Sequence, residues 1–195
     1  MITWDAVVVA GGRGTRLGGA SKPDLSVGGV PLLDRALDAV TAARETVVVG
    51  GPTREGVRWT VEDPPGSGPA KALAAGLAAL SAPAPWTVVL AVDTPRSADA
   101  VPRLVAAIAD AGAEEVAQGG GIDGAWIVDG EGEAQPLLAI YRSAALVEQS
   151  RDLEEGTSMR RLVAGLTMVA VPDLDGVARD LDTWADAEFW KEQLG

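Results

Sequence analysis

A short apolar run that stops at a glycine-rich segment limits most strongly what this chain can fold into. Residues 6–10 read Ala-Val-Val-Val-Ala without polar alternation, and Gly11 and Gly12 follow directly. This pattern is typical of a strand buried on both faces, as in parallel sheets covered by helices on both sides. Residues 32–40 then carry apolar side chains at helical spacing. Strand, loop and helix in this order open a βαβ unit.

The same alternation continues along the chain. It predicts an α/β fold with three layers and a largely parallel sheet. No linker or internal repeat interrupts the 195 residues, so we expect one domain over residues 1–195. The expected strands lie at residues 46–50, 58–61, 87–92, 125–128, 137–141 and 167–171, and the expected helices at residues 70–80, 102–111, 143–149, 158–164 and from Trp184 onward.

Composition excludes several kinds of chemistry. The chain has no Cys and no His, which rules out a thiol nucleophile, a zinc site of the usual type and a Ser-His-Asp triad. The net charge of −12 disfavours nucleic-acid binding, because a phosphate backbone would be repelled. The chain contains no apolar run of the ~20 residues that a membrane span needs, and its first residues do not resemble a signal peptide. We therefore expect a cytoplasmic protein without membrane contacts that uses carboxylates, Lys, Arg and backbone amides.

The segment from residue 10 to residue 22 predicts a polyphosphate site. It combines several glycines with Arg13, Arg16 and Lys22 directly after the first strand. Glycines let backbone N–H groups approach an anion, and the cations neutralise its charge. A P-loop is excluded because Ala20 stands where its Lys belongs, and the dinucleotide fingerprint is excluded because Leu17 replaces its third glycine. The alternative is a flexible surface loop.

Three carboxylates stand where a ligand could reach them. Asp93 follows a buried strand, at the edge of an open α/β sheet where ligands bind. With Asp182 as a second contact it would suit Mg²⁺, which prefers one or two carboxylates together with substrate phosphates. The alternatives are a helix cap or a turn for Asp93 and a helix-start role before Thr183 for Asp182. Asp63 precedes a Pro/Gly-rich stretch and suits either a nucleoside contact or an Asx turn.

Five segments in order resemble one family. Residues 10–18 with Lys22 resemble the signature loop of nucleotidyltransferases, and the spacing to Lys22 is most similar to the molybdenum cofactor guanylyltransferase family. The other similar segments are residues 62–69, 92–95, 135–142 and 180–186. The chain departs from the family pattern at Ala70-Lys71, at Arg96 and at Trp184.

The resemblance implies a Rossmann-like nucleotidyltransferase fold with a mixed, mostly parallel sheet, and it implies Mg²⁺ as the cofactor. The implied catalytic residues are Arg16, Lys22 and Asp93, and the implied metal ligands are Asp93 and Asp182. The implied nucleotide-binding residues are Ala10, Gly11, Gly12, Gly14, Thr15, Arg16, Lys22, Asp63, Gly68, Pro69 and Asp93.

The expected activity is transfer of GMP from GTP to a phosphorylated pterin, molybdopterin or its molybdenum-loaded form, with release of pyrophosphate. One alternative is a related transferase that acts on a sugar 1-phosphate or cobinamide phosphate, or on molybdopterin with CTP. Another is a nucleotide-binding regulator without turnover, which would be favoured if Asp93 and Lys22 lay far from a common crevice.

Overall fold

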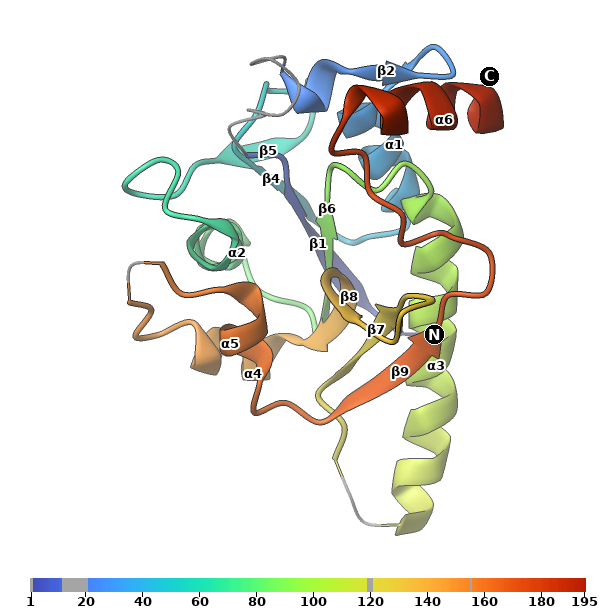
Figure 1. The fold of residues 1–195 in the computed structure, drawn as a ribbon. Helices are drawn as coiled ribbons and strands as arrows, with labels where there is room; N and C mark the ends of the chain where they lie inside the picture. Colours follow the sequence, from blue (N-terminus) through green and yellow to red (C-terminus); the bar gives the residue numbers. More distant parts are fainter. Residues whose placement is uncertain (1, 12–20, 119–120, 155) are drawn as a thin grey trace.

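A seven-stranded sheet runs through the part of the chain that the computed structural model describes, residues 2–11, 21–118, 121–154 and 156–195 (Figure 1). The strand order is β5-β4-β1-β6-β8-β7-β9. Only β8 runs against its two neighbours, so the sheet is mixed and mostly parallel, as expected. The bounds are β1 Trp4–Val9, β4 Thr46–Val49, β5 Arg58–Thr60, β6 Trp86–Ala91, β7 Gly124–Val128, β8 Ala134–Arg142 and β9 Met168–Pro172.

Helices cover both faces of this sheet and give the three layers (Figure 1). The side chains of one sheet face, with Val8, Leu90 and Ile140, pack under α1, α3 and α6. Those of the other face, with Val7 and Val89, pack under α2, α4 and α5. The helices are α1 Leu32–Ala39, α2 Pro69–Ala79, α3 Ser97–Gln118, α4 Ser143–Gln149, α5 Met159–Val163 and α6 Trp184–Leu194.

The central strands are parallel and in register, which places the ends of β1 and β6 together. Val9 pairs with Ala91, and the backbone N–H of Val92 donates to the Val9 carbonyl at 3.1 Å. The segments that follow, Ala10-Gly11 and Val92-Asp93, therefore leave the sheet at the same edge.

Three local differences from the expected elements have physical causes. β1 begins at Trp4 because the buried Asp5 carboxylate is held by the Arg44 guanidinium at 2.9 and 2.8 Å and by the Ala84 N–H. Helix α3 begins at Ser97, ahead of Pro102, because Ala100 and Val101 are buried in the core and outweigh the lost proline N–H. A small hairpin of β2 (Ser26–Val27) and β3 (Val30–Pro31) was not expected.

Among the described residues, no helix is long and apolar enough to cross a membrane.

Candidate active site

Lys22, Asp93 and Asp182 meet although they lie far apart in the sequence. The Lys22 ammonium donates to Asp93 Oδ2 at 3.0 Å and to Asp182 Oδ1 at 2.6 Å. Lys22 opens a short 3-10 helix, η2 (Lys22–Asp24), and its side chain is 14% exposed. Burial opposes its charge, but the two carboxylates outweigh burial and raise the pKa of Lys22 above its ordinary value. Lys22 is therefore a fixed cation at neutral pH.

Two backbone features bring Asp182 to this place. The N–H of Leu181 donates to the Asp93 carbonyl at 2.8 Å, and the Leu181 side chain is fully buried. Thr183 then caps α6 in a capping box with Asp186. Since Thr183 caps the helix, the Asp182 carboxylate is turned toward Lys22 instead. Asp182 thus lies at the start of α6 and also contacts Lys22.

A third acid stands near this cluster. The pKa of Asp180 is raised by burial in the first place and then by the carboxylates of Asp182 and Asp93. The sequence alone assigns Asp180 no role of its own, because a single acid in a loop carries no distinctive signal.

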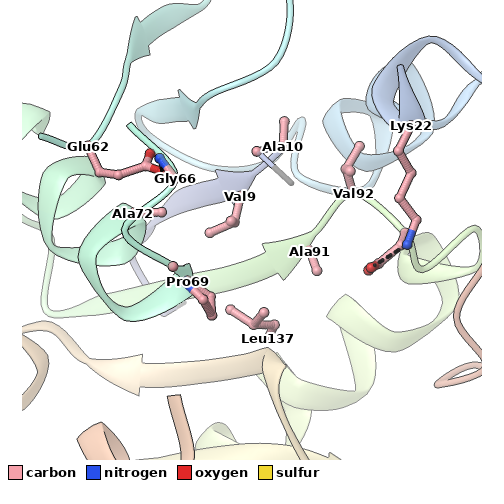
Figure 2. Close-up of a pocket in the computed structure, with 13 residues that line it drawn as sticks. Val9, Ala10, Lys22, Glu62, Gly66, Pro69, Ala72, Ala91, Val92 and Leu137 are labelled. Carbon is pink, nitrogen blue, oxygen red and sulfur yellow. Dashed lines mark hydrogen bonds and ion pairs between the residues drawn. The ribbon is translucent and has the colours of Figure 1, made fainter. Parts of the chain in front are cut away.

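A pocket of about 300 Å³ opens beside the cluster, at the carboxyl ends of β1 and β6. Six of the residues expected to bind nucleotide line it: Ala10, Gly11, Lys22, Gly68, Pro69 and Asp93. Figure 2 shows Lys22 at one side of the pocket, Glu62 and Gly66 at the other, and Val9, Ala91 and Leu137 between them. The expected residues Gly12, Gly14, Thr15 and Arg16 lie outside the described part of the chain.

The adjacent residues Glu62 and Asp63 are placed differently at the Gly66 side of the pocket. Asp63, expected to contact the nucleoside, is exposed and does not line the pocket, whereas Glu62 lines it and is only 6% exposed. The sequence placed both residues in one segment but gave no sign of which would face inward, because they lie beyond the end of β5, where strand alternation no longer applies.

Two glycines allow the segment after β4 to lie close to the segment after β1. A Cβ on Gly50, whose φ is +72°, would lie 2.8 Å from the Gly11 Cα. Trp59 Nε1 donates to the carbonyls of Gly50 and Gly51 at 3.1 and 3.2 Å. These two hydrogen bonds hold the turn after β4 to the side chain of a β5 residue.

The donor set at the cluster has the chemistry that Mg²⁺ requires. Asp93 and Asp182 present carboxylate oxygens to one cation, the Lys22 ammonium, which shows that the position favours positive charge. Within the described residues no three potential metal-ligating side chains form a group. A magnesium ion at these carboxylates would thus need phosphate or water oxygens as well, which is its usual preference.

The chain is similar to known proteins in both sequence and fold. The chain is 26% identical to the molybdenum cofactor guanylyltransferase of Serratia proteamaculans, over 97% of this chain and 94% of that protein. Its fold is similar to the molybdopterin-guanine dinucleotide biosynthesis protein A of Archaeoglobus fulgidus, with a TM-score of 0.72, 20% identity and 97% of each chain covered. It is also similar to the 2-C-methyl-D-erythritol 4-phosphate cytidylyltransferase of Thermus thermophilus, with a TM-score of 0.66, 21% identity and 96% of each chain covered.

The family model described as the MobA-like NTP transferase domain matches residues 6–171, from Ala6 within β1 to Val171 within β9. Together with the lysine and carboxylate cluster at the strand ends, this match shows that the chain belongs to the MobA-like NTP transferase family and is a nucleotidyltransferase.

Proposed function

We propose that this nucleotidyltransferase transfers GMP from GTP to molybdopterin, or to its molybdenum-loaded form, and releases pyrophosphate. The observation that carries the proposal is the convergence of Lys22, Asp93 and Asp182 beside a pocket at the ends of β1 and β6. The name of the Serratia relative supports the choice of nucleotide and acceptor, because that protein matches nearly the whole chain.

The proposed reaction is a displacement at the α-phosphorus of GTP. An oxygen of the acceptor phosphate forms the new bond to this phosphorus, and the bond to the pyrophosphate oxygen breaks. The Lys22 ammonium, with Arg16, stabilises the negative charge that develops on the α-phosphate and on pyrophosphate, and such electrostatic stabilisation usually contributes most to phosphoryl transfer. No general base is required, since a phosphate monoester is already ionised near neutral pH.

Mg²⁺ is part of the proposal. Asp93, with Asp182 as the second contact, would hold it, and the bound ion would supply charge neutralisation at the nucleotide oxygens. The role of Lys22 is then to provide a second positive charge for the phosphates beside these carboxylates.

The two alternatives from the sequence differ in how the structure bears on them. A regulator without turnover would be favoured by a lysine and carboxylates that fail to converge, and Lys22 Nζ lies 3.0 Å from Asp93 Oδ2. A transferase with another nucleotide remains the relevant competitor, because the fold is shared with a cytidylyltransferase.

Pyrophosphate release with each of the four NTPs, measured with and without molybdopterin, tests the proposed function. We expect release with GTP that depends on molybdopterin and on Mg²⁺. A preference for CTP would assign the chain to the competing transferase reaction. If all four NTPs gave no release while the protein still bound nucleotide, the regulator would be the better description.

A further inference from the structure

Glu62 is a buried carboxylate in the pocket, and only one of its two oxygens has a hydrogen-bond partner among the described residues. Its Oε1 accepts the backbone N–H of Gly66 at 2.8 Å. Its Oε2 is buried and has no hydrogen-bond partner among the described residues. The side chain as a whole is 6% exposed and belongs to the pocket lining.

Such an arrangement is costly unless a ligand completes it. An ionised carboxylate has about four acceptor positions, and a buried charged oxygen without a donor destabilises the protein. The pocket lining includes Val9, Ala10, Pro69 and Ala72, whose side chains offer no hydrogen-bond donor, and the lysine of the lining lies on the opposite side (Figure 2). The missing donors therefore have to come from whatever fills the pocket.

The position of Glu62 indicates which part of a nucleotide would supply them. Figure 2 shows Glu62 and Lys22 at opposite sides of the pocket. The cation at the Lys22 side attracts phosphates, whereas the anionic Glu62 repels them. A nucleotide bound with its phosphates at Lys22 extends its base toward Glu62, between the apolar side chains.

We propose that the Glu62 carboxylate selects the nucleobase by accepting two adjacent N–H donors from its edge, and that it thereby favours guanine. This inference rests on the proposed function. Guanine presents the ring N1–H and the 2-amino group side by side, which matches the two oxygens of a carboxylate. Adenine and cytosine present one amino group beside an acceptor nitrogen, and uracil presents one N–H between two carbonyls.

The first test changes the nucleotide and leaves the protein intact. We would measure the Kd of the wild-type protein by calorimetry in Mg²⁺ for GTP, for ITP, which lacks the 2-amino group, and for N1-methyl-GTP, which lacks the N1–H. We expect each analogue to bind about 10- to 100-fold more weakly than GTP, the range of one charge-assisted hydrogen bond. Equal affinities for all three nucleotides would overturn the inference, whether or not any variant folds.

The second test changes Glu62. Glu62→Gln keeps an oxygen for the Gly66 N–H but places an amide NH₂, a donor, opposite the donors of guanine. We expect the Kd for GTP to rise about 10- to 100-fold and the ratio between GTP and ITP to fall toward one. Glu131→Gln, which removes the same charge from an exposed turn, is the matched control and should leave the ratio unchanged.

The results separate this inference from the proposed function. An unchanged ratio in Glu62→Gln, or loss of selectivity in Asp63→Asn instead, would overturn the role of Glu62 while GTP turnover persists. A wild-type protein that binds none of the NTPs would overturn both proposals.

Discussion

At the residue scale, the site depends on a lysine that is held between two acids. Lys22 Nζ lies within 3.0 Å of Asp93 Oδ2 and 2.6 Å of Asp182 Oδ1, and its raised pKa keeps the ammonium charged through the neutral range. The same ammonium that neutralises the two carboxylates in the free protein is available to the phosphates of a bound nucleotide.

Lys22→Ala should lower the turnover of GTP-dependent pyrophosphate release by ~100- to 1,000-fold, the typical effect of removing one charge-stabilising donor. The fold should persist, because Lys22 lies in a short 3-10 helix and belongs to neither hydrophobic core cluster. Steady-state kinetics and thermal melts check both points. Lys191→Ala, which alters an exposed lysine of α6, is the matched control. Turnover near that of the wild type in Lys22→Ala would refute the assignment.

Asp93 and Asp182 should respond differently to neutralisation. Asp93→Asn removes the charge of the residue that we propose as the principal Mg²⁺ ligand, so turnover should collapse by about 100-fold or more and ordinary Mg²⁺ concentrations should not restore it. Asp182→Asn keeps an oxygen for the second contact, so we expect partial activity with a weaker apparent affinity for Mg²⁺. A Mg²⁺ titration of both variants decides the order. A mild Asp93→Asn with a severe Asp182→Asn would invert the assignment.

At the element scale, the position of Asp182 is set by the loop that follows β9. The Asp173 carboxylate accepts the N–H groups of Val177 and Ala178, both at 2.9 Å, and folds the loop on itself. Asp175 then ties the loop to α3 through Arg103, at 2.7 and 2.8 Å, and to Arg96 at 3.1 Å. Arg96, one of the departures from the family pattern, thus has a visible role in this chain.

Asp175→Asn should loosen this loop and raise the Mg²⁺ concentration needed for half-maximal activity several-fold. The Arg103 hydrogen bond first, and then Arg96, lower the pKa of Asp175 from 3.8 to about 2. A carboxylate whose pKa is lower in the folded than in the unfolded protein stabilises the folded state at every pH above its unfolded-state pKa. This contribution is lost as the pH falls from about 4 to about 2. Urea unfolding should therefore give a higher free energy of unfolding for the wild type than for Asp175→Asn at pH 7. This difference in free energy should become smaller in acid. A difference in the free energy of unfolding that does not change with pH would contradict a stabilising role of the Asp175 ion pairs.

Helix α2 also depends on a close approach, at Gly76. A Cβ at this position would lie 2.5 Å from Val7 Cγ1 and 2.9 Å from Val49 Cγ2. Gly76→Ala should destabilise the protein by about 1–3 kcal/mol, since overpacking outweighs the gain in helix propensity. Gly112→Ala in α3, where a Cβ meets no described atom within 4 Å, should stabilise it by about 0.5–1 kcal/mol. Equal effects of both substitutions in urea unfolding would contradict the packing argument.

At the scale of the whole molecule, the pocket joins parts of the chain that fold together. Val9, Pro69, Val92 and Leu137 line it, and they come from the segments around β1, α2, β6 and β8. A ligand in the pocket therefore stabilises the entire domain and not one loop.

GTP with Mg²⁺ should raise the melting temperature by roughly 5–10 °C at about 100 times Kd, because binding to the folded state alone contributes about 2.7 kcal/mol. Mg²⁺ alone should give a smaller rise, as counterions reduce the self-repulsion of a chain with net charge −12. Differential scanning calorimetry of the wild type and of Asp93→Asn checks this expectation. An equal rise in melting temperature with GTP and Mg²⁺ in both proteins would indicate that Mg²⁺ does not bind at Asp93.

Local sequence pattern was sufficient to predict the main helices and strands and the edge of the sheet where the site lies. The apolar runs at residues 6–10 and 87–92 predicted buried parallel strands, and β1 and β6 pair in this way. Most strands and helices are offset by only a few residues, because burial patterns persist along an element while its ends depend on partners. Helix α3 shows the largest offset, because it covers Ser97–Gln118 whereas the expected helix covered residues 102–111. Its early start could not be expected, since the sequence does not reveal that Ala100 and Val101 meet a core.

The sequence by itself determined the three-layer α/β fold, the family and the edge of the sheet where the site lies, because each follows from local periodicity and from ordered segments of specific composition. Only the tertiary structure decided which side chains meet. Residues 22, 93 and 182 converge through strand pairing and through the Leu181 N–H, and Glu62 faces the pocket while Asp63 faces solvent. The physical reason is that a side chain outside a regular element takes its direction from long-range contacts, which local spacing does not encode.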